Sequence, residues 1–344
     1  KPFISAQTTI QSTLWGMDQL DVSIAAWSAR NCSNATMRFV SIRDIATVIQ
    51  GADMAVKGLK WLAGVGLFLS ILGGVCSAEG FKTVEVWKNL FTVINGDGID
   101  SNTTFLITRE GVVVVDTRVT PIEADKVLAE IRKQTDLPIL YTINTHYHGD
   151  HTFGNQIFKD SIAIIAHENV RKSLAGSSGK QHLDSFKTMN ITGMNETVIT
   201  LPNMIFKEKM EIFVGGYHLK LIHVRGHTDG DLFIYIKELS TLITGDLVFN
   251  GKIPYMADAY VEDWISALNY LGNLDAEIYI PGHGAPGGKP VFLAMKHYLF
   301  NLKGMVLNQL EKGKSLKETQ DVVRPALKEK YKTWKNLDWL DANI

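Results

Sequence analysis

The chain of 344 residues contains only two cysteines, Cys32 and Cys76, and both lie near its N-terminus. A disulfide framework and a cysteine-rich zinc finger are therefore excluded, and the rest of the chain has neither a thiol nucleophile nor a thiolate metal ligand. An excess of one charge is also missing, because 35 Lys and Arg residues face 36 Asp and Glu residues, for a formal net charge of -1. This balance provides no broad positive field, which argues against nucleic acid as a partner.

Long apolar stretches are scarce as well. The most pronounced runs from Trp61 to Val75, and it is shorter than the roughly 20 residues that cross a membrane as a helix. Lys57 and Lys60 precede the run and small residues up to Ala78 follow it, which is the order of parts in a secretory signal peptide. We therefore predict a signal peptide at residues 54–78 and a periplasmic or secreted product, with no stable membrane insertion after cleavage.

The chain is predicted to have four parts. Residues 1–53 are an N-terminal extension without an assigned function, residues 54–78 are the signal peptide, residues 79–290 carry the main domain, and residues 291–344 add helices at the C-terminus. For residues 54–78, the alternatives to a signal peptide are an uncleaved membrane anchor and a lipoprotein attached through Cys76. A hydrophobic content of 45% and a charged content of 21% are typical of a globular protein with a core, which excludes disorder.

Strands and helices alternate in the pattern after residue 81. Strands are expected at 104–108, 112–115, 138–143, 162–166, 212–214, 217–224, 232–236, 241–243 and 277–280. Helices are expected at 121–134, 261–271, 291–310 and 315–328. Interleaved strands and helices predict a layered α/β protein, followed by a solvated C-terminal helical extension.

A cluster of three histidines and a carboxylate follows the strand expected at 138–143. It comprises His146, His148, Asp150 and His151. In an extended segment alternate side chains share a face, so His146 and His148 project together. Nitrogen and oxygen donors at this density suit Zn²⁺, Fe or Mn.

Three further potential ligands occupy glycine-containing loops at strand ends. They are His227 in Gly-His-Thr-Asp-Gly-Asp, Asp246 in Thr-Gly-Asp, and His283 in Pro-Gly-His-Gly. Glycine lets the backbone approach a ligand closely, and α/β active sites collect in such loops. The sequence therefore predicts one shared metal site. The other five histidines, His167, His182, His218, His223 and His297, do not fit this pattern and receive no role.

This ordered set, from His146-x-His148-x-Asp150-His151 to His283, resembles the metallo-β-lactamase superfamily, and the resemblance extends from about Phe81 to Pro290. It implies an αββα sandwich with a C-terminal helical extension and a site for two zinc ions per chain. One metal would take His146, His148 and His227. The other would take Asp150, His151 and His283, with Asp246 bridging both.

The same resemblance implies a hydrolase that acts on a small-molecule substrate through a metal-bound hydroxide. Asp150 would hold its metal and orient the attacking water, while Asp246 bridges. Tyr255 is a candidate to stabilise an oxyanion, and Trp87, Phe249 and Met256 are candidates to line the mouth of the site. Asp116, at the end of the strand 112–115, is a candidate to hydrogen-bond a ligating histidine and fix its tautomer. The alternative is an ordinary turn residue at a strand end.

The resemblance favours an exported dinuclear zinc hydrolase that cleaves a small ester, thioester, lactone or β-lactam. Asp246 stands where the best-known zinc β-lactamases have cysteine, and it is similar to the glyoxalase II, lactonase and phosphodiesterase branches. A mononuclear iron persulfide dioxygenase on the same fold is the alternative, and a non-catalytic binding module is a third. Substrate specificity is expected in loops at Asn95 to Asn102 and Gly176 to Asn195. The sequence indicates no oligomeric state.

Overall fold

The structure, a computed structural model, describes residues 81–94 and 101–344. The predicted N-terminal extension, the predicted signal peptide at residues 54–78 and most of the predicted specificity loop Asn95 to Asn102 lie outside these residues. None of the helices in the described part is long and apolar enough to cross a membrane.

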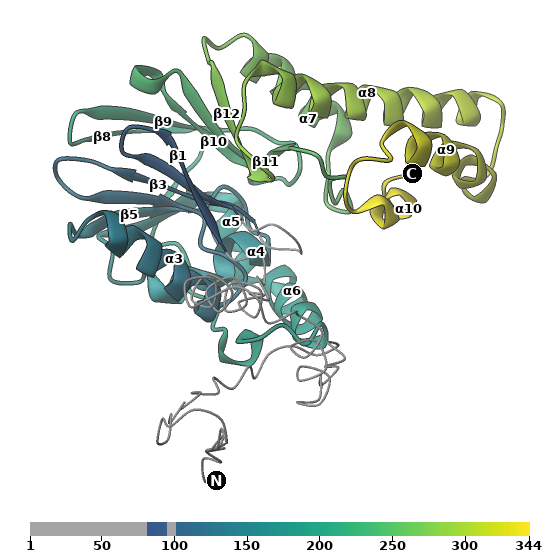
Figure 1. Cartoon of the computed structure of the whole chain (residues 1–344). Coiled ribbons are helices and arrows are strands. Elements are labelled where there is room, and N and C mark those ends of the chain that lie inside the picture. Colours follow the sequence, from purple (N-terminus) through teal and green to yellow (C-terminus); the bar gives the residue numbers. More distant parts are fainter. Residues whose placement is uncertain (1–80, 95–100) are drawn as a thin grey trace, which may run out of the picture. The chain divides into compact units, whose positions relative to one another are not determined.

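Two β-sheets form the centre of the described part (Figure 1). The first has seven strands in chain order, namely β1 (Lys82–Trp87), β2 (Leu90–Ile94), β3 (Thr103–Ile107), β4 (Val112–Val115), β5 (Ile139–Ile143), β6 (Ala163–His167) and β7 (Met204–Phe206). The second has five strands in the reverse order, namely β12 (Ile278–His283), β11 (Thr241–Phe249), β10 (Leu232–Ile236), β9 (Tyr217–His223) and β8 (Lys209–Val214).

Parallel pairing in each sheet brings several strand ends to one edge. Strands β4 to β7 run parallel, as do β11 and β12, while the other pairs are antiparallel. Since the carboxyl ends of parallel strands meet at the same edge, the residues that follow β4 and β5 lie near each other, as do those at the ends of β11 and β12. This arrangement positions the candidate site.

Helices connect and cover the sheets. The α-helices are α3 (Pro121–Gln134), α4 (Gly149–Thr152), α5 (Glu168–Ala175), α6 (Ser177–Thr188), α7 (Val261–Gly272), α8 (Lys289–Glu311), α9 (Leu316–Lys330) and α10 (Leu340–Asn343). Short 3₁₀ turns are η1 (Phe153–Ile157), η2 (Met194–Glu196), η3 (Lys237–Leu239) and η4 (Leu337–Trp339). Figure 1 shows α3 to α6 beside the first sheet and α7 to α9 beside the second.

The alternation of side chains along strands explains the four layers. In β4, Val113 and Val115 are buried in one core with apolar residues of the second sheet, such as Leu221 and Ile234. Val112 and Val114 point the other way and pack with Val127 and other residues of α3. A strand that is apolar on both faces must be covered on both. The predicted αββα sandwich is therefore confirmed.

The C-terminal helices are part of this fold rather than a solvated appendage. Phe292, Met295 and Leu299 of α8 and Val323 of α9 are buried in one core with Trp264 of α7. The helix α9 begins as the sequence predicts, with a capping box between Ser315 and Glu318. The inner faces of residues 291–344 thus contribute to the core that the second sheet shares, and only their outer faces are solvated.

One predicted loop is a helix. The segment Gly176 to Asn195 is predicted as a loop, but it contains α6 and the start of η2. Gly179 permits this, because a Cβ atom there would lie 2.4 Å from the carbonyl oxygen of Leu174 in α5. Close packing against α5 thus outweighs the weak helix propensity of the segment.

Candidate metal centre

The structure brings all seven predicted ligand residues together from four separate segments of the chain. His146 and His148 follow β5, Asp150 and His151 lie in α4, His227 follows β9, Asp246 lies within β11, and His283 ends β12. Each is buried, with at most 8% of its surface exposed. They form two groups of possible ligand atoms, each no more than 4.8 Å across.

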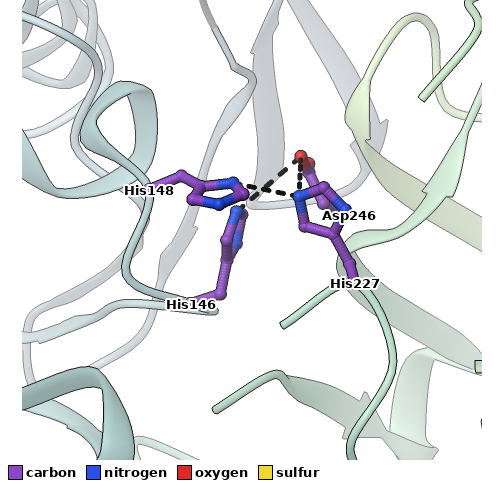
Figure 2. A group of neighbouring side chains, drawn as sticks. All are labelled: His146, His148, His227 and Asp246. Carbon is purple, nitrogen blue, oxygen red and sulfur yellow. Dashed lines mark hydrogen bonds and ion pairs between the residues drawn. The ribbon is translucent and has the colours of Figure 1, made fainter. Parts of the chain in front are cut away.

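The first group consists of His146, His148, His227 and Asp246, shown in Figure 2. His227 Nε2 lies 3.0 Å from His148 Nδ1 and 3.3 Å from Asp246 Oδ2. His146 Nε2 lies 3.7 Å from the same oxygen. Three imidazole nitrogens and one carboxylate oxygen thus point at a common position, which is a ligand set that suits zinc.

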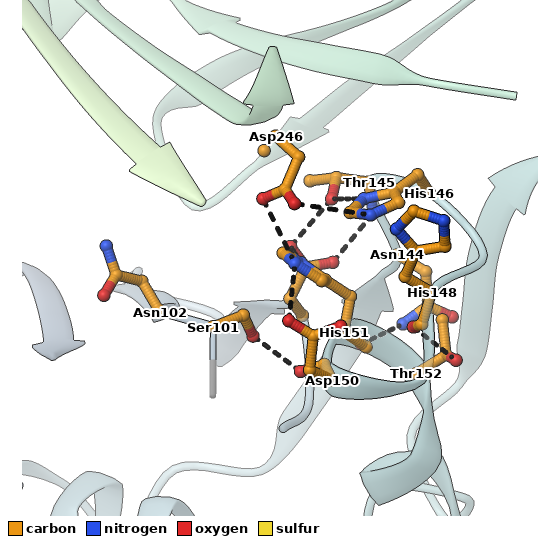
Figure 3. Close-up of polar contacts among 12 residues, drawn as sticks. Ser101, Asn102, Asn144, Thr145, His146, His148, Asp150, His151, Thr152 and Asp246 are labelled. Carbon is orange, nitrogen blue, oxygen red and sulfur yellow. Dashed lines mark hydrogen bonds and ion pairs between the residues drawn. The ribbon is translucent and has the colours of Figure 1, made fainter. Parts of the chain in front are cut away.

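The second group consists of Asp150, His151 and His283. Asp150 Oδ2 lies 3.4 Å from His151 Nε2 and 3.2 Å from His283 Nε2. Asp246 reaches this group too, because its Oδ1 lies 3.2 Å from His151 Nε2 and its Oδ2 lies 3.4 Å from His283 Nε2. Figure 3 shows His151 between the carboxylates of Asp150 and Asp246. Asp246 therefore faces both groups.

Asp116 orients two of the candidate ligands, His151 directly and His146 through Thr145. The hydrogen bond to a ligating histidine is the one that the sequence predicted. Its Oδ2 lies 2.7 Å from His151 Nδ1 and accepts a hydrogen bond of 2.8 Å from the hydroxyl of Thr145. Its Oδ1 accepts a hydrogen bond of 2.8 Å from the backbone N–H of Thr145. The Thr145 hydroxyl is in turn 3.1 Å from His146 Nδ1. With their Nδ1 atoms engaged in this way, both histidines present Nε2 to the ligand groups.

His148 is oriented in the opposite sense by a carboxylate that the sequence analysis missed. Its Nε2 lies 3.0 Å from Asp258 Oδ2, so that Nδ1 is the atom that faces His227. The ring of His182, from α6, stacks on His148 with centroids 4.9 Å apart. His148, His182 and Asp258 form a third possible ligand group. His182 therefore belongs to the site, although it was given no role.

Glycines allow the segments to approach this closely. Gly245 has φ +50, and a Cβ atom there would lie 2.6 Å from the side chain of Thr145. A Cβ atom on Gly282 would lie 1.9 Å from Asp246 Oδ1. The pairing of β11 with β12 is irregular around Gly245. Only glycine fits at these positions, which bring the loop after β5 and the end of β12 against Asp246.

Within the first group, burial and neighbouring charges favour the metal-binding forms of His146, His227 and Asp246. Burial lowers the pKa of His146 well below its usual value, and repulsion from His151 adds to this effect. Burial also lowers the pKa of His227 to about 3. For Asp246, burial opposes ionisation, but the interactions with His283, His151 and His146 together outweigh it and hold the pKa well below its usual value. The first group thus combines the neutral imidazoles of His146 and His227 with the ionised carboxylate of Asp246.

Buried side-chain atoms without hydrogen bonds also indicate that the seven residues fit a pair of metal ions. His146 Nε2, His151 Nε2 and Asp246 Oδ1 are fully buried and make no well-formed hydrogen bond, although His151 Nε2 and Asp246 Oδ1 lie 3.2 Å apart. Buried polar atoms are normally satisfied, and atoms left unpartnered cost free energy. These three atoms lie on the sides of the residues that face the two groups. Coordination to divalent ions would satisfy them.

A cavity of about 230 Å³ opens onto the ligand groups. Phe249 and Tyr255 line it, as expected, and the Tyr255 ring lies 6.0 Å from that of His148. The expectations for Trp87 and Met256 are wrong. The indole of Trp87 donates a hydrogen bond to Thr241 at the start of β11, and Met256 is buried in the core with α7 and α8.

Several residues that line the cavity come from elements outside the predicted ligand loops. His182, Ser185, Phe186 and Met189 belong to α6 or directly follow it, and Trp339 ends η4. The spacing of His182, Phe186 and Met189 at i, i+4 and i+7 is typical of one face of a helix. That periodicity is the sequence signal that could have identified this wall.

Comparison with known proteins agrees with this architecture. The family model of the metallo-beta-lactamase superfamily matches residues 96–283. A linear primary-alkylsulfatase of Pseudomonas sp. (strain ATCC 19151) is 24% identical over 213 residues, which cover 52% of this chain and 40% of that protein. A metallo-beta-lactamase type 2 of Bacillus sp. (strain 170) is 26% identical over 206 residues, which cover 58% of this chain and 72% of that protein. The chain thus spans less than half the length of the alkylsulfatase.

Among solved structures, a metallo-beta-lactamase from Pontibacter korlensis is similar with a TM-score of 0.55 and 19% identity, over 64% of this chain and 100% of that one. At this identity the likeness concerns the fold. The family match covers more than half of the chain and includes every ligand-bearing loop described above. The chain belongs to the metallo-β-lactamase superfamily.

Proposed function

We propose that the protein is a dinuclear zinc hydrolase that cleaves a small ester, thioester, lactone or β-lactam. The observation that carries this proposal is the position of Asp246, whose carboxylate lies 3.2 Å from His151 Nε2 on one side and 3.3 Å from His227 Nε2 on the other. One buried carboxylate thus faces both ligand groups beside a single cavity. Membership of the superfamily supports a hydrolase.

Each group of side chains has a role in this proposal. His146, His148 and His227 would hold one ion, Asp150, His151 and His283 would hold the other, and Asp246 would bridge them. Two divalent ions held there would supply a water-derived nucleophile near neutral pH and would polarise the substrate carbonyl.

The cavity lining suggests what the chain itself contributes. Asp150 lines the cavity, where its carboxylate can orient the attacking water. Tyr255 also lines the cavity, and its hydroxyl can donate a hydrogen bond to an oxyanion. Burial, followed by the charge of Asp258, raises the pKa of Tyr255, which keeps its proton on the oxygen for this purpose.

We also propose that the protein is exported to the periplasm or the medium. This proposal rests on the sequence pattern of residues 54–78.

The alternative function is a mononuclear iron persulfide dioxygenase. A single metal ion would leave the second group without a purpose, although Asp150, His151 and His283 are buried and converge. The dinuclear hydrolase therefore accounts for more of the site.

The proposal is tested with the full chain loaded with zinc. The substrates are a chromogenic cephalosporin, p-nitrophenyl acetate, a phenyl thioester and a γ-lactone, each with and without a chelator. We expect turnover of at least one, lost on chelation and restored by zinc. The variant His148→Ala should fold but lose activity. No turnover of any substrate by protein that holds two zinc ions, or full activity in His148→Ala, would contradict the proposal. Oxygen uptake with a persulfide by protein that binds one iron would support the dioxygenase instead.

A further inference from the structure

The cavity beside the ligand groups has an apolar wall. Away from the ligands, its largest lining side chains are Phe186, Met189, Phe249, Tyr255 and Trp339. The rings of Tyr255 and Trp339 pack edge to face with centroids 5.8 Å apart. Aromatic side chains at this density favour an apolar group, and the wall is built by α6, β11, the segment after β11 and η4 together.

The wall carries no positive charge. Within residues 81–94 and 101–344, no Lys or Arg lines this cavity. Divalent ions at the ligand groups would attract an anion to the reacting position, but not to the aromatic side chains. A carboxylate placed at this wall would be desolvated without a cationic side chain to pair with, at a cost in free energy.

The volume of the cavity limits the size of the group that fits. A closed apolar cavity of about 150 Å³ accepts a benzene molecule, and this cavity has about 230 Å³. A phenyl ring or a chain of several carbon atoms can therefore fit in this open cavity, with the scissile carbonyl directed to the ligand groups.

We propose that the substrate is an uncharged ester, thioester or lactone whose phenyl or short alkyl group lies among Phe186, Met189, Tyr255 and Trp339, and that substrates with a carboxylate on this group are rejected. The inference rests on the proposed hydrolase function and narrows its substrate class. It disfavours β-lactams, whose carboxylate lies next to the ring that is cleaved.

The first test measures binding, so that it does not depend on turnover. The probes are N-methylhexanamide and its anionic analogue, in which the terminal methyl is a carboxylate, and their Kd values for the zinc-loaded full chain are measured by calorimetry. We expect the neutral amide to bind at least tenfold more tightly. The variants Trp339→Ala and Phe186→Ala should each weaken it about tenfold. Phe300→Ala, which removes an exposed aromatic side chain of α8 that does not line this cavity, should leave the Kd unchanged.

The second test measures hydrolysis of p-nitrophenyl acetate and p-nitrophenyl butanoate. Burial of one methylene is worth about a factor of four in binding, so the two additional methylenes should raise kcat/KM about fifteenfold. Trp339→Ala should remove most of this difference through KM. Tighter binding of the anionic amide, no binding of the neutral one, or the same chain-length dependence in folded Trp339→Ala and Phe186→Ala would overturn the inference. Selective binding of the neutral amide without any hydrolysis would uphold the apolar subsite and contradict the proposed hydrolase.

Discussion

Replacement of Asp116 by asparagine probes how the second ligand group is held. The carboxylate of Asp116 is buried and accepts from both donors of Thr145 while it contacts His151 Nδ1 at 2.7 Å. In Asp116→Asn, the side-chain oxygen can stay on the backbone N–H of Thr145, but the amide N–H₂ then faces His151. An imidazole that accepts at Nδ1 carries its proton on Nε2, and Nε2 is the atom that faces Asp150 and Asp246.

The expected size of the effect follows from the lost interaction. A hydrogen bond to a charged group contributes about 1.5–3 kcal/mol, and outer partners of metal ligands typically affect affinity by about 10- to 100-fold. We expect zinc affinity to fall by about 10- to 100-fold at the site of the second group, which contains His151, and to change less than about threefold at the site of the first group. His146 should be affected less, because the hydroxyl of Thr145 can still accept from its Nδ1.

The assay is a competition titration of the metal-free full chain with zinc and a chromogenic chelator, fitted to two sites. Asp125→Asn, which alters an exposed carboxylate on α3, is the matched control and should match wild type. Asp258→Asn gives the complementary result, because it releases Nε2 of His148 and should weaken the other site. Unchanged affinities in folded Asp116→Asn, or an equal loss at both sites, would refute this reasoning.

The remaining predictions concern the closest contact, a buried histidine and the candidate oxyanion donor. Gly282→Ala should displace the Asp246 carboxylate, because the new methyl group would lie 1.9 Å from Oδ1. Zinc affinity should therefore fall at both sites in a calorimetric titration, and wild-type affinity at both sites would contradict the close approach. Burial, and then the stacked ring of His223, lower the pKa of His167 from 6.5 to about 4. Folding therefore favours the neutral form of His167. The resulting contribution to the free energy of unfolding is fully present above pH 6.5 and is lost as the pH falls toward 4. Between pH 7 and 4.5 the metal-free His167→Gln variant should lose about 2 kcal/mol less unfolding free energy in urea than wild type, and an equal loss would count against the shift. Tyr255→Phe should lower kcat without changing zinc content, and an unchanged kcat would remove Tyr255 from the proposed mechanism.

The sequence predicted local structure well where the local signals agree. The helix α3 spans the predicted residues because Thr120 caps it, Pro121 occupies its first turn, and its apolar residues recur at helical spacing. It predicted β11 poorly, since the strand was expected to end at Ile243 but continues to Phe249. Gly245 has the sequence character of a loop, and irregular pairing with β12 nevertheless keeps this segment in the sheet.

The metal ligands could be predicted from the sequence, but the wall of the cavity could not. The seven possible ligands stand in short motifs that the sequence displays directly, and the structure brings them together. His182, Asp258 and Trp339 were missed because their relation to the site depends on how α6, the segment after β11 and η4 pack around the cavity. No short motif records such contacts between distant segments.

The metal content of the full chain tests the central claim most directly. The protein is loaded with zinc, freed of excess metal by gel filtration, and analysed by inductively coupled plasma mass spectrometry beside Asp246→Ala, whose folding is checked by circular dichroism. The account predicts two zinc ions per chain in wild type and fewer in Asp246→Ala, because that carboxylate faces both ligand groups. One zinc ion or none in folded wild type, or two in Asp246→Ala, would contradict it.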